Sequence, residues 1–238
     1  MPPRSQRCPR EAWPVERIDN APMPNRPAPE SRPLAIALAG LLALAIAMGI
    51  GRFAFTPLLP MMLHDGVVDL PGASWLATAN YLGYWLGAMG CALQPGLWRR
   101  WGLAPLAHTT TVRLGLVATV LLTLGMALPG SALWVLWRGL AGVASALVFV
   151  YVSGWCLARL STLGVPALAG LIYVGPGLGI AASGFAASAM VAFGMRAATG
   201  WALFALLALG LTALAWPQLT GTVKASAAAA TDDAHPSR

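Results

Sequence analysis

The chain has 238 residues, of which 58% are hydrophobic and only 10% are charged. A soluble domain carries about 25% charged residues, so this chain cannot cover itself with a hydrated surface. The formal net charge of +7 is a poor sign of nucleic-acid binding, because the basic residues form no patch or stripe. The composition therefore predicts a protein whose main partner is the lipid bilayer.

Two polar tails enclose an apolar region. Residues 1–33 are rich in proline and arginine, and residues 217–238 are polar and alanine-rich, so both are predicted to be disordered cytoplasmic tails. The region between them, residues 34–216, divides into apolar runs near the length of about 20 residues that a bilayer-crossing helix requires. We predict six spans at residues 34–63, 75–94, 104–128, 132–158, 166–193 and 197–216.

The loop charges predict the orientation of these spans. One side holds the arginine-rich N-terminal tail and the other side holds acids in its first loop. Basic residues accumulate in cytoplasmic loops, so both termini are predicted to lie in the cytoplasm of a bacterial inner membrane. The residues used are Arg99, Arg100, Arg159, Lys224 and Arg238 for the cytoplasmic side, and Asp65, Asp69 and Arg196 for the outer side.

Arg52 is a charge deep within the first apolar run. About eighteen uncharged residues precede it and eleven follow it. A charge at that depth costs from about 3 to more than 10 kcal/mol unless it faces a cavity or a partner. Such residues commonly mark a substrate or ion pathway, so the chain is predicted to be a membrane transporter.

The second span carries a row of small residues. Ala79, Gly83, Gly87 and Cys91 recur every four residues and so share one helix face, which lets another helix approach closely. Asn80 and Tyr84 lie on the neighbouring face. For Asn80 two roles stay open: a hydrogen bond between helices, or the lining of a cavity.

Enzymatic and metal sites find little support in the sequence. The three cysteines show no metal-ligand spacing, and no nucleotide-binding loop or other cofactor motif occurs, so we expect no metal and no cofactor. A serine-protease reading fails because the later spans contain no histidine to act as the base. We therefore expect a protein that is not an enzyme.

Two segments resemble a known family. Residues 49–60, GIGRFAFTPLLP, and residues 75–87, WLATANYLGYWLG, resemble the YbfB/YjiJ-like branch of the major facilitator superfamily. The resemblance covers about residues 34–216. It implies an all-α membrane protein with six transmembrane helices, arranged as a 3+3 inverted repeat that forms one half of a major facilitator fold. It also implies secondary-active transport by alternating access.

The fourth and fifth spans carry further motifs of that superfamily. Arg138 followed by Gly142 is similar to the fourth-helix motif, and the resemblance implies a coupling or substrate-response role for Arg138. Gly175, Pro176 and Gly179 are similar to the fifth-helix motif of antiporters. Because proline removes a backbone hydrogen bond and glycine permits close contact, a kinked packing seam explains the same three residues.

The loop predicted after the second span resembles the end of the superfamily's gating motif. Arg100 and Gly102 match that motif, whereas Arg99 stands where the motif has an aspartate. The substitution removes the negative charge that the motif uses as a cytoplasmic latch. Gating of the usual kind is therefore in question for this chain.

The two intramembrane arginines need a counter-charge, and no acidic residue occurs between Leu70 and Thr231. Three explanations stay open. A small anionic or zwitterionic substrate supplies the charge through bidentate bonds; acids of a second half or a second copy supply it; or backbone carbonyls, Thr56, Asn80 and water solvate the arginines. The first explanation makes Arg52, Thr56, Asn80, Tyr84 and Arg138 the substrate-binding or coupling residues.

The functional prediction is a secondary transporter, or half of one. A superfamily transporter places its substrate site between two six-helix halves, and the motif order here matches the N-terminal half. A homodimer or a separately encoded second half is therefore the expected partner. The alternatives are a truncated N-terminal half that does not transport, and a membrane scaffold subunit.

Overall fold

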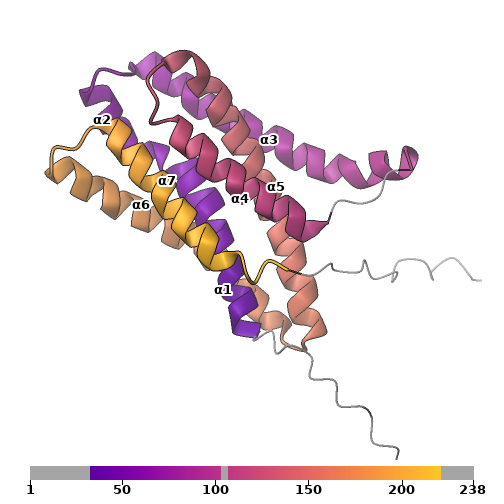
Figure 1. The fold of residues 1–238 in the computed structure, drawn as a ribbon. Helices are drawn as coiled ribbons and strands as arrows, with labels where there is room; N and C mark the ends of the chain where they lie inside the picture. The colour runs from indigo at the N-terminus through magenta and orange to yellow at the C-terminus, as the bar shows by residue number, and fades with distance from the viewer. Residues whose placement is uncertain (1–32, 103–106, 221–238) are drawn as a thin grey trace, which may run out of the picture. The chain divides into compact units, whose positions relative to one another are not determined.

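The computed structural model describes residues 33–102 and 107–220, and the two predicted tails lie largely outside these residues. Within them all regular structure is helical (Figure 1). The elements in order are α1 (Pro33–Leu44), the π-helix η1 (Ala45–Phe53), α2 (Phe55–His64), α3 (Leu70–Arg100), α4 (His108–Gly125), the 3-10 helix η2 (Ser131–Leu133), α5 (Trp134–Thr162), the 3-10 helix η3 (Pro166–Tyr173), α6 (Val174–Ala192) and α7 (Ala197–Ala215).

Four of the described helical segments are long and apolar enough to cross a membrane: Pro33–His64, Trp134–Thr162, Pro166–Ala192 and Ala197–Ala215. A helical segment also lies within each of the other two predicted ranges, as α3 and α4. Whether all six cross the bilayer stays a prediction, because α3 and α4 are long enough but are not among these four segments.

Helix α3 extends at both ends beyond the second predicted span, residues 75–94. At its start the Asp69 side chain accepts a hydrogen bond of 2.8 Å from the backbone N–H of Gly72, which satisfies a free donor of the first turn. At its end the helix continues through Pro95 to Arg100, where we expected a loop. Arg99 and Arg100 occupy the last turn, where positive charge stabilises the carbonyl end of a helix.

Long helices pack through glycine seams. Helix α3 packs along α5, and α6 packs along η1 (Figure 1). A Cβ atom on Gly142 of α5 would lie 2.7 Å from the backbone nitrogen of Tyr84. A Cβ atom on Gly179 of α6 would lie 2.8 Å from Cα of Gly49. Only glycine permits backbones to approach this closely, so these residues set the distances between the helices.

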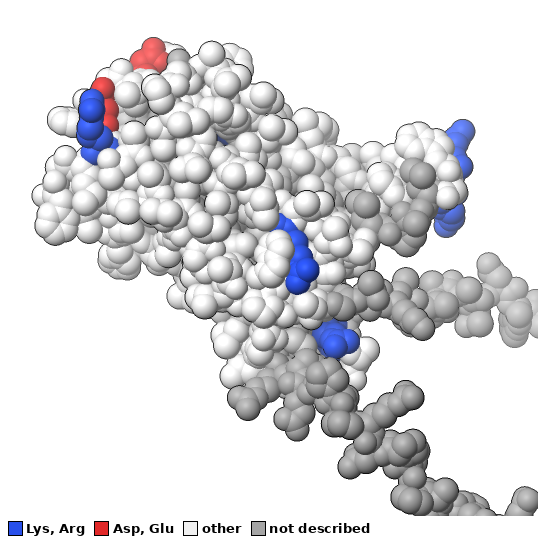
Figure 2. Space-filling view, in the orientation of Figure 1, with Lys and Arg blue, Asp and Glu red and all other residues white. Residues whose placement is uncertain are grey.

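Large apolar side chains cover much of the described surface. On α3 alone Tyr81, Leu82, Trp85 and Leu86 are each more than half exposed. Figure 2 shows acidic side chains only at one end of the face it draws, with a wide uncharged surface beside them. An apolar surface of this size is unfavourable in water and indicates contact with a lipid bilayer or a protein partner.

Candidate functional site

The first helix is interrupted by nine residues of π-helix, Ala45–Phe53, and Arg52 lies near its end. A π-helix is rare and is frequently found at functional sites. The segment contains Gly49 and Gly51, both buried. A Cβ atom on Gly51 would lie 2.7 Å from Cγ2 of Thr119 on α4, so the segment is closely packed on that side as well.

Arg138 of α5 binds directly to this π-helix. Its Nη1 donates to the carbonyl oxygen of Gly51 at 3.2 Å, and its Nη2 donates to the carbonyl oxygen of Arg52 at 3.0 Å. Its guanidinium carbon lies 4.9 Å from the centre of the Phe55 ring. Arg138 is only 3% exposed, so it lies inside the helix packing and does not line an open space.

Two polar side chains fix the helices around Arg138. Asn80 of α3 is 2% exposed, and its Nδ2 donates to the carbonyl oxygen of Arg138 at 2.9 Å. Ser145 of α5 donates from Oγ to the carbonyl oxygen of Ala47 in the π-helix at 2.5 Å. In this structure Asn80 therefore makes a hydrogen bond between helices.

Arg52 has a different environment. It is only partly buried, and its guanidinium carbon lies 4.0 Å from the ring centre of Tyr84, 5.0 Å from that of Tyr81 and 5.3 Å from that of Phe53. Tyr81 is itself 54% exposed, so this cluster reaches the surface of the described helices. Aromatic faces attract a cation while leaving its hydrogen-bond donors free to bind an anion.

The Nε atoms of both arginines are buried without an acceptor among the described residues. For Arg138 two other nitrogens are satisfied by carbonyls, whereas for Arg52 aromatic rings surround the guanidinium. Unsatisfied donors on a buried cation are costly, so Arg52 has capacity for an anionic group. The arrangement thus combines one cation held by backbone with a second that can take a ligand.

The remaining predicted residues lie in three places. Thr56 is exposed on α2, one turn beyond Arg52. Pro176 is only partly buried, on α6. Arg100 and Gly102 are exposed beyond the glycine seams, and Gly102 has a φ of 64° that ends α3 in a left-handed turn. The seam between α3 and α5 contains Gly83, Gly87 and Gly142, and that between α6 and the first helix contains Gly175 and Gly179.

Four residues of the arginine cluster were not predicted as site residues: Phe53, Phe55, Tyr81 and Ser145. Tyr81 lies three residues before Tyr84, so both fall on one face of α3, and this spacing was a usable signal. Ser145 follows Arg138 by seven residues, two helical turns, which also places both on one face. Phe55 gave no such signal, since its contact depends on how α5 packs against α2.

Comparison with known proteins gives one match. The family described as "Uncharacterised MFS-type transporter YbfB" matches residues 44–238, which include the π-helix, both arginines and all the glycine seams. No curated protein and no solved structure matched the chain. The match covers most of the chain and agrees with the apolar helices of the fold. The chain therefore belongs to the YbfB family of major facilitator transporters and is a multi-pass membrane protein.

Proposed function

We propose that the protein moves a small anionic or zwitterionic solute across the bacterial inner membrane by alternating access. The observation that carries the proposal is Arg52: a partly buried guanidinium ringed by Tyr81 and Tyr84, with an unpaired Nε. A carboxylate or phosphate oxygen satisfies such a cation through charge-assisted hydrogen bonds. A cationic solute would be repelled, because none of the six predicted spans contains an acid to compensate Arg52.

In this proposal Arg138 couples the site to the helix packing. It binds the two carbonyls at the end of the π-helix, one of which belongs to Arg52 itself. Any movement of Arg52 along the first helix therefore changes the bonds of Arg138. Asn80 links the same point of α5 to α3, where Tyr84 contacts Arg52.

The proposed architecture is six crossings in a 3+3 inverted repeat, with both termini in the cytoplasm. A second set of six helices completes the cavity, as in the superfamily. The exposed apolar face of α3 at Leu82, Trp85 and Leu86 supports this partner, because it is adjacent to Tyr81 of the arginine cluster.

Uptake into proteoliposomes tests the proposal. The purified chain is reconstituted and given radiolabelled acetate, succinate, alanine and putrescine, which represent an anion, a dianion, a zwitterion and a dication. We expect uptake of an anion or the zwitterion, and its loss in Arg52→Leu with insertion preserved. Native mass spectrometry of the same preparation should give a dimer if copies assemble with each other.

Other outcomes favour other functions. Uptake of putrescine alone, or unchanged uptake by Arg52→Leu, would remove Arg52 from the mechanism. A monomer that transports none of the four solutes would instead favour a non-transporting half or a scaffold subunit. Arg159→Gln serves as the matched control, since Arg159 is an exposed arginine at the end of α5.

A further inference from the structure

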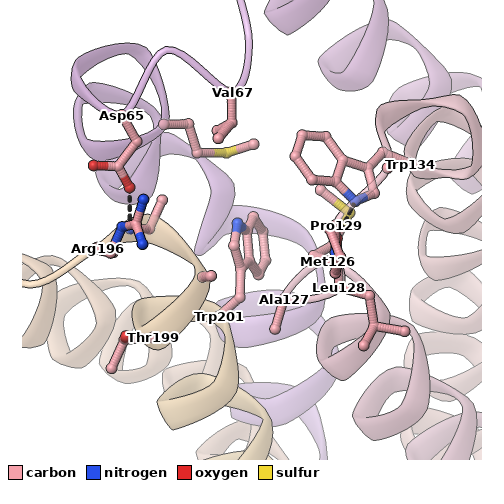
Figure 3. A pocket seen from close by; sticks show the side chains of 14 residues that line it. Asp65, Val67, Met126, Ala127, Leu128, Pro129, Trp134, Arg196, Thr199 and Trp201 are labelled. Carbon is pink, nitrogen blue, oxygen red and sulfur yellow. Dashed lines mark hydrogen bonds between the residues drawn. The ribbon is translucent and has the colours of Figure 1, made fainter.

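A cavity lies away from the arginine cluster, where three connections between helices meet. It has a volume of about 540 Å³ and is lined by the ends of α2 and α4, the start of α5 and the start of α7 (Figure 3). Small-molecule sites in proteins usually have volumes of about 300–1,000 Å³. The size of this cavity is therefore suited to a ligand of metabolite size.

The walls of the cavity are mainly apolar. Met62, Met126, Trp134 and Trp201 all line it, and each is buried, Trp201 to 1% exposure. Figure 3 shows the Trp201 indole in the middle of the lining, with Trp134 on one side. Two indole rings and two methionines form a surface that favours an aromatic or branched apolar group.

A pair of opposite charges lies at one side of this cavity. Asp65 and Arg196 both line it, and Figure 3 shows their side chains next to each other, opposite Trp134. Oδ2 of Asp65 accepts a hydrogen bond of 2.6 Å from the backbone N–H of Ala197, which fixes the carboxylate at the first turn of α7. Arg196 is exposed, so its guanidinium is accessible at the rim.

Trp201, one of the lining residues, also carries a hydrogen-bond donor at its ring edge. Nε1 of Trp201 is buried and has no acceptor among the described residues. In contrast, Nε1 of Trp134 donates to the carbonyl oxygen of Leu128 at 3.3 Å. The Trp201 nitrogen lies on the edge of the ring that faces away from the α7 backbone, towards the connection that carries Asp65 and Val67 (Figure 3). An unpaired buried N–H is costly, and a ligand oxygen would satisfy it.

From these contacts we propose that the cavity is a binding site for a small zwitterion with an apolar side group. The second oxygen of Asp65 accepts from the ligand's ammonium group, Arg196 and the Trp201 N–H donate to its anionic oxygens, and the apolar group lies between the indoles. A simple anion would be repelled by Asp65, and a simple cation by Arg196. Only a ligand with both charges matches the pair.

The site goes beyond the transport proposal. It uses none of the residues around Arg52, and binding at equilibrium needs neither a second half nor solute movement. An aminophospholipid headgroup carries the same ammonium and anionic oxygens on an apolar chain. The ligand chemistry is therefore shared by a free amino acid and a lipid, and the experiment separates these two sources.

Fluorine NMR of the purified full-length chain in detergent tests the site with 4-fluoro-L-phenylalanine as the probe. We expect a saturable shift of the fluorine signal. N-acetyl-4-fluoro-L-phenylalanine lacks the ammonium group, and 4-fluorophenethylamine lacks the carboxylate. Each analogue should bind at least about tenfold more weakly, since each loses a hydrogen bond to a charged group.

Variants locate the binding. Arg196→Gln and Asp65→Asn should each weaken probe binding by about tenfold or more. Asparagine keeps an oxygen that can still accept from Ala197, so Asp65→Asn preserves the contact with α7. Trp201→Phe removes the N–H and keeps an aromatic wall. It should therefore weaken binding of the ligand's anionic oxygens and leave the contact with its apolar group nearly unchanged. Arg159→Gln should bind the probe as the parent chain does.

A signal that never saturates, or equal binding of all three probes, would overturn the proposal, because it would indicate simple partition into detergent. Unchanged binding in both Arg196→Gln and Asp65→Asn would overturn it as well. Competition by added phosphatidylethanolamine, with none by phosphatidylglycerol, would identify the lipid headgroup as the natural source. Absence of competition, with saturable probe binding, would identify a free zwitterion.

Discussion

Arg138 and Arg52 differ in what surrounds each guanidinium. Carbonyl oxygens of the π-helix hold the guanidinium of Arg138, which is 3% exposed. Aromatic rings hold that of Arg52, which is only partly buried. The first arrangement contributes to the packing of α5 on the first helix, and the second leaves a cation able to bind a ligand.

Thermal unfolding in detergent should therefore separate the two residues. Arg138→Met leaves the carbonyls of Gly51 and Arg52 without these donors, at about 1–3 kcal/mol for each unsatisfied group. We expect a clearly lower melting temperature for this variant. Arg52→Met should leave the melting temperature nearly unchanged. Equal melting temperatures for the two variants would contradict this division of roles.

The sequence predicted one arginine environment better than the other. Arg52 stands out because a charge within a long uncharged run is costly wherever it points. The burial of Arg138 depends on which face of α5 meets the first helix, and the spacing along one helix does not determine that. The carbonyl solvation that we held open for both arginines is the arrangement seen for Arg138.

At the scale of the element, the glycines of α6 differ in their neighbours. A Cβ atom on Gly179 would lie 2.6 Å from the carbonyl oxygen of Ala45, whereas a Cβ atom on Gly177 would meet nothing within 4 Å. These two residues lie two positions apart on one helix and have similar intrinsic effects on helix stability. Their variants therefore isolate the contact with the π-helix.

We expect Gly179→Ala to destabilise the protein by about 1–3 kcal/mol, the usual cost of overpacking. Gly177→Ala should be neutral or slightly stabilising, since alanine favours the helix more than glycine does. Thermal unfolding of the two variants, with the yield of monodisperse protein as a second readout, checks this. A similar loss in both variants would show that helix propensity, and not close contact, decides the result.

The helices were easier to predict from the sequence than their winding. Apolar runs place the elements, because bilayer thickness imposes that pattern. The π-helix of Ala45–Phe53 continues the apolar run of the α-helix before it, and hydropathy does not report how a helix is wound. The helical residues 95–100 were missed because they were assigned to the loop that resembles the gating motif.

At the scale of the whole molecule, the loop charges predict which end of each helix faces the cytoplasm. Helix α5 offers a matched pair of labelling sites, because Ala132 precedes it and Ser161 lies in its last turn, both exposed. A cysteine at each position reports on one end of a single helix. The parent chain, with its own three cysteines, gives the background labelling.

We expect Ala132→Cys to react with a membrane-impermeant maleimide in intact spheroplasts. Ser161→Cys should react only after the membrane is permeabilised, because basic loops stay in the cytoplasm. Labelling in the reverse order would invert the orientation. Equal labelling of both sites in intact spheroplasts would contradict the crossing of α5 itself.

The cavity lined by Trp134 and Trp201 could not be predicted from the sequence. Among its polar residues, Asp65 lies more than a hundred residues before Arg196 and Trp201. In the sequence, Asp65 and Arg196 served only to predict orientation. Their meeting follows from how α2 and α7 pack, which no local pattern encodes.

The π-helix also links the pitch of the first helix to the position of a charge. A π-helix holds more residues per unit length than an α-helix does. Rewinding this segment as an α-helix would therefore lengthen the first helix and turn Arg52 about the helix axis, by about 100° for each residue of register. Arg138 opposes that rotation, because it holds the carbonyls of Gly51 and Arg52. Arg138 thus restrains the first helix. Release of its hydrogen bonds would let rotation of that helix displace the Arg52 guanidinium.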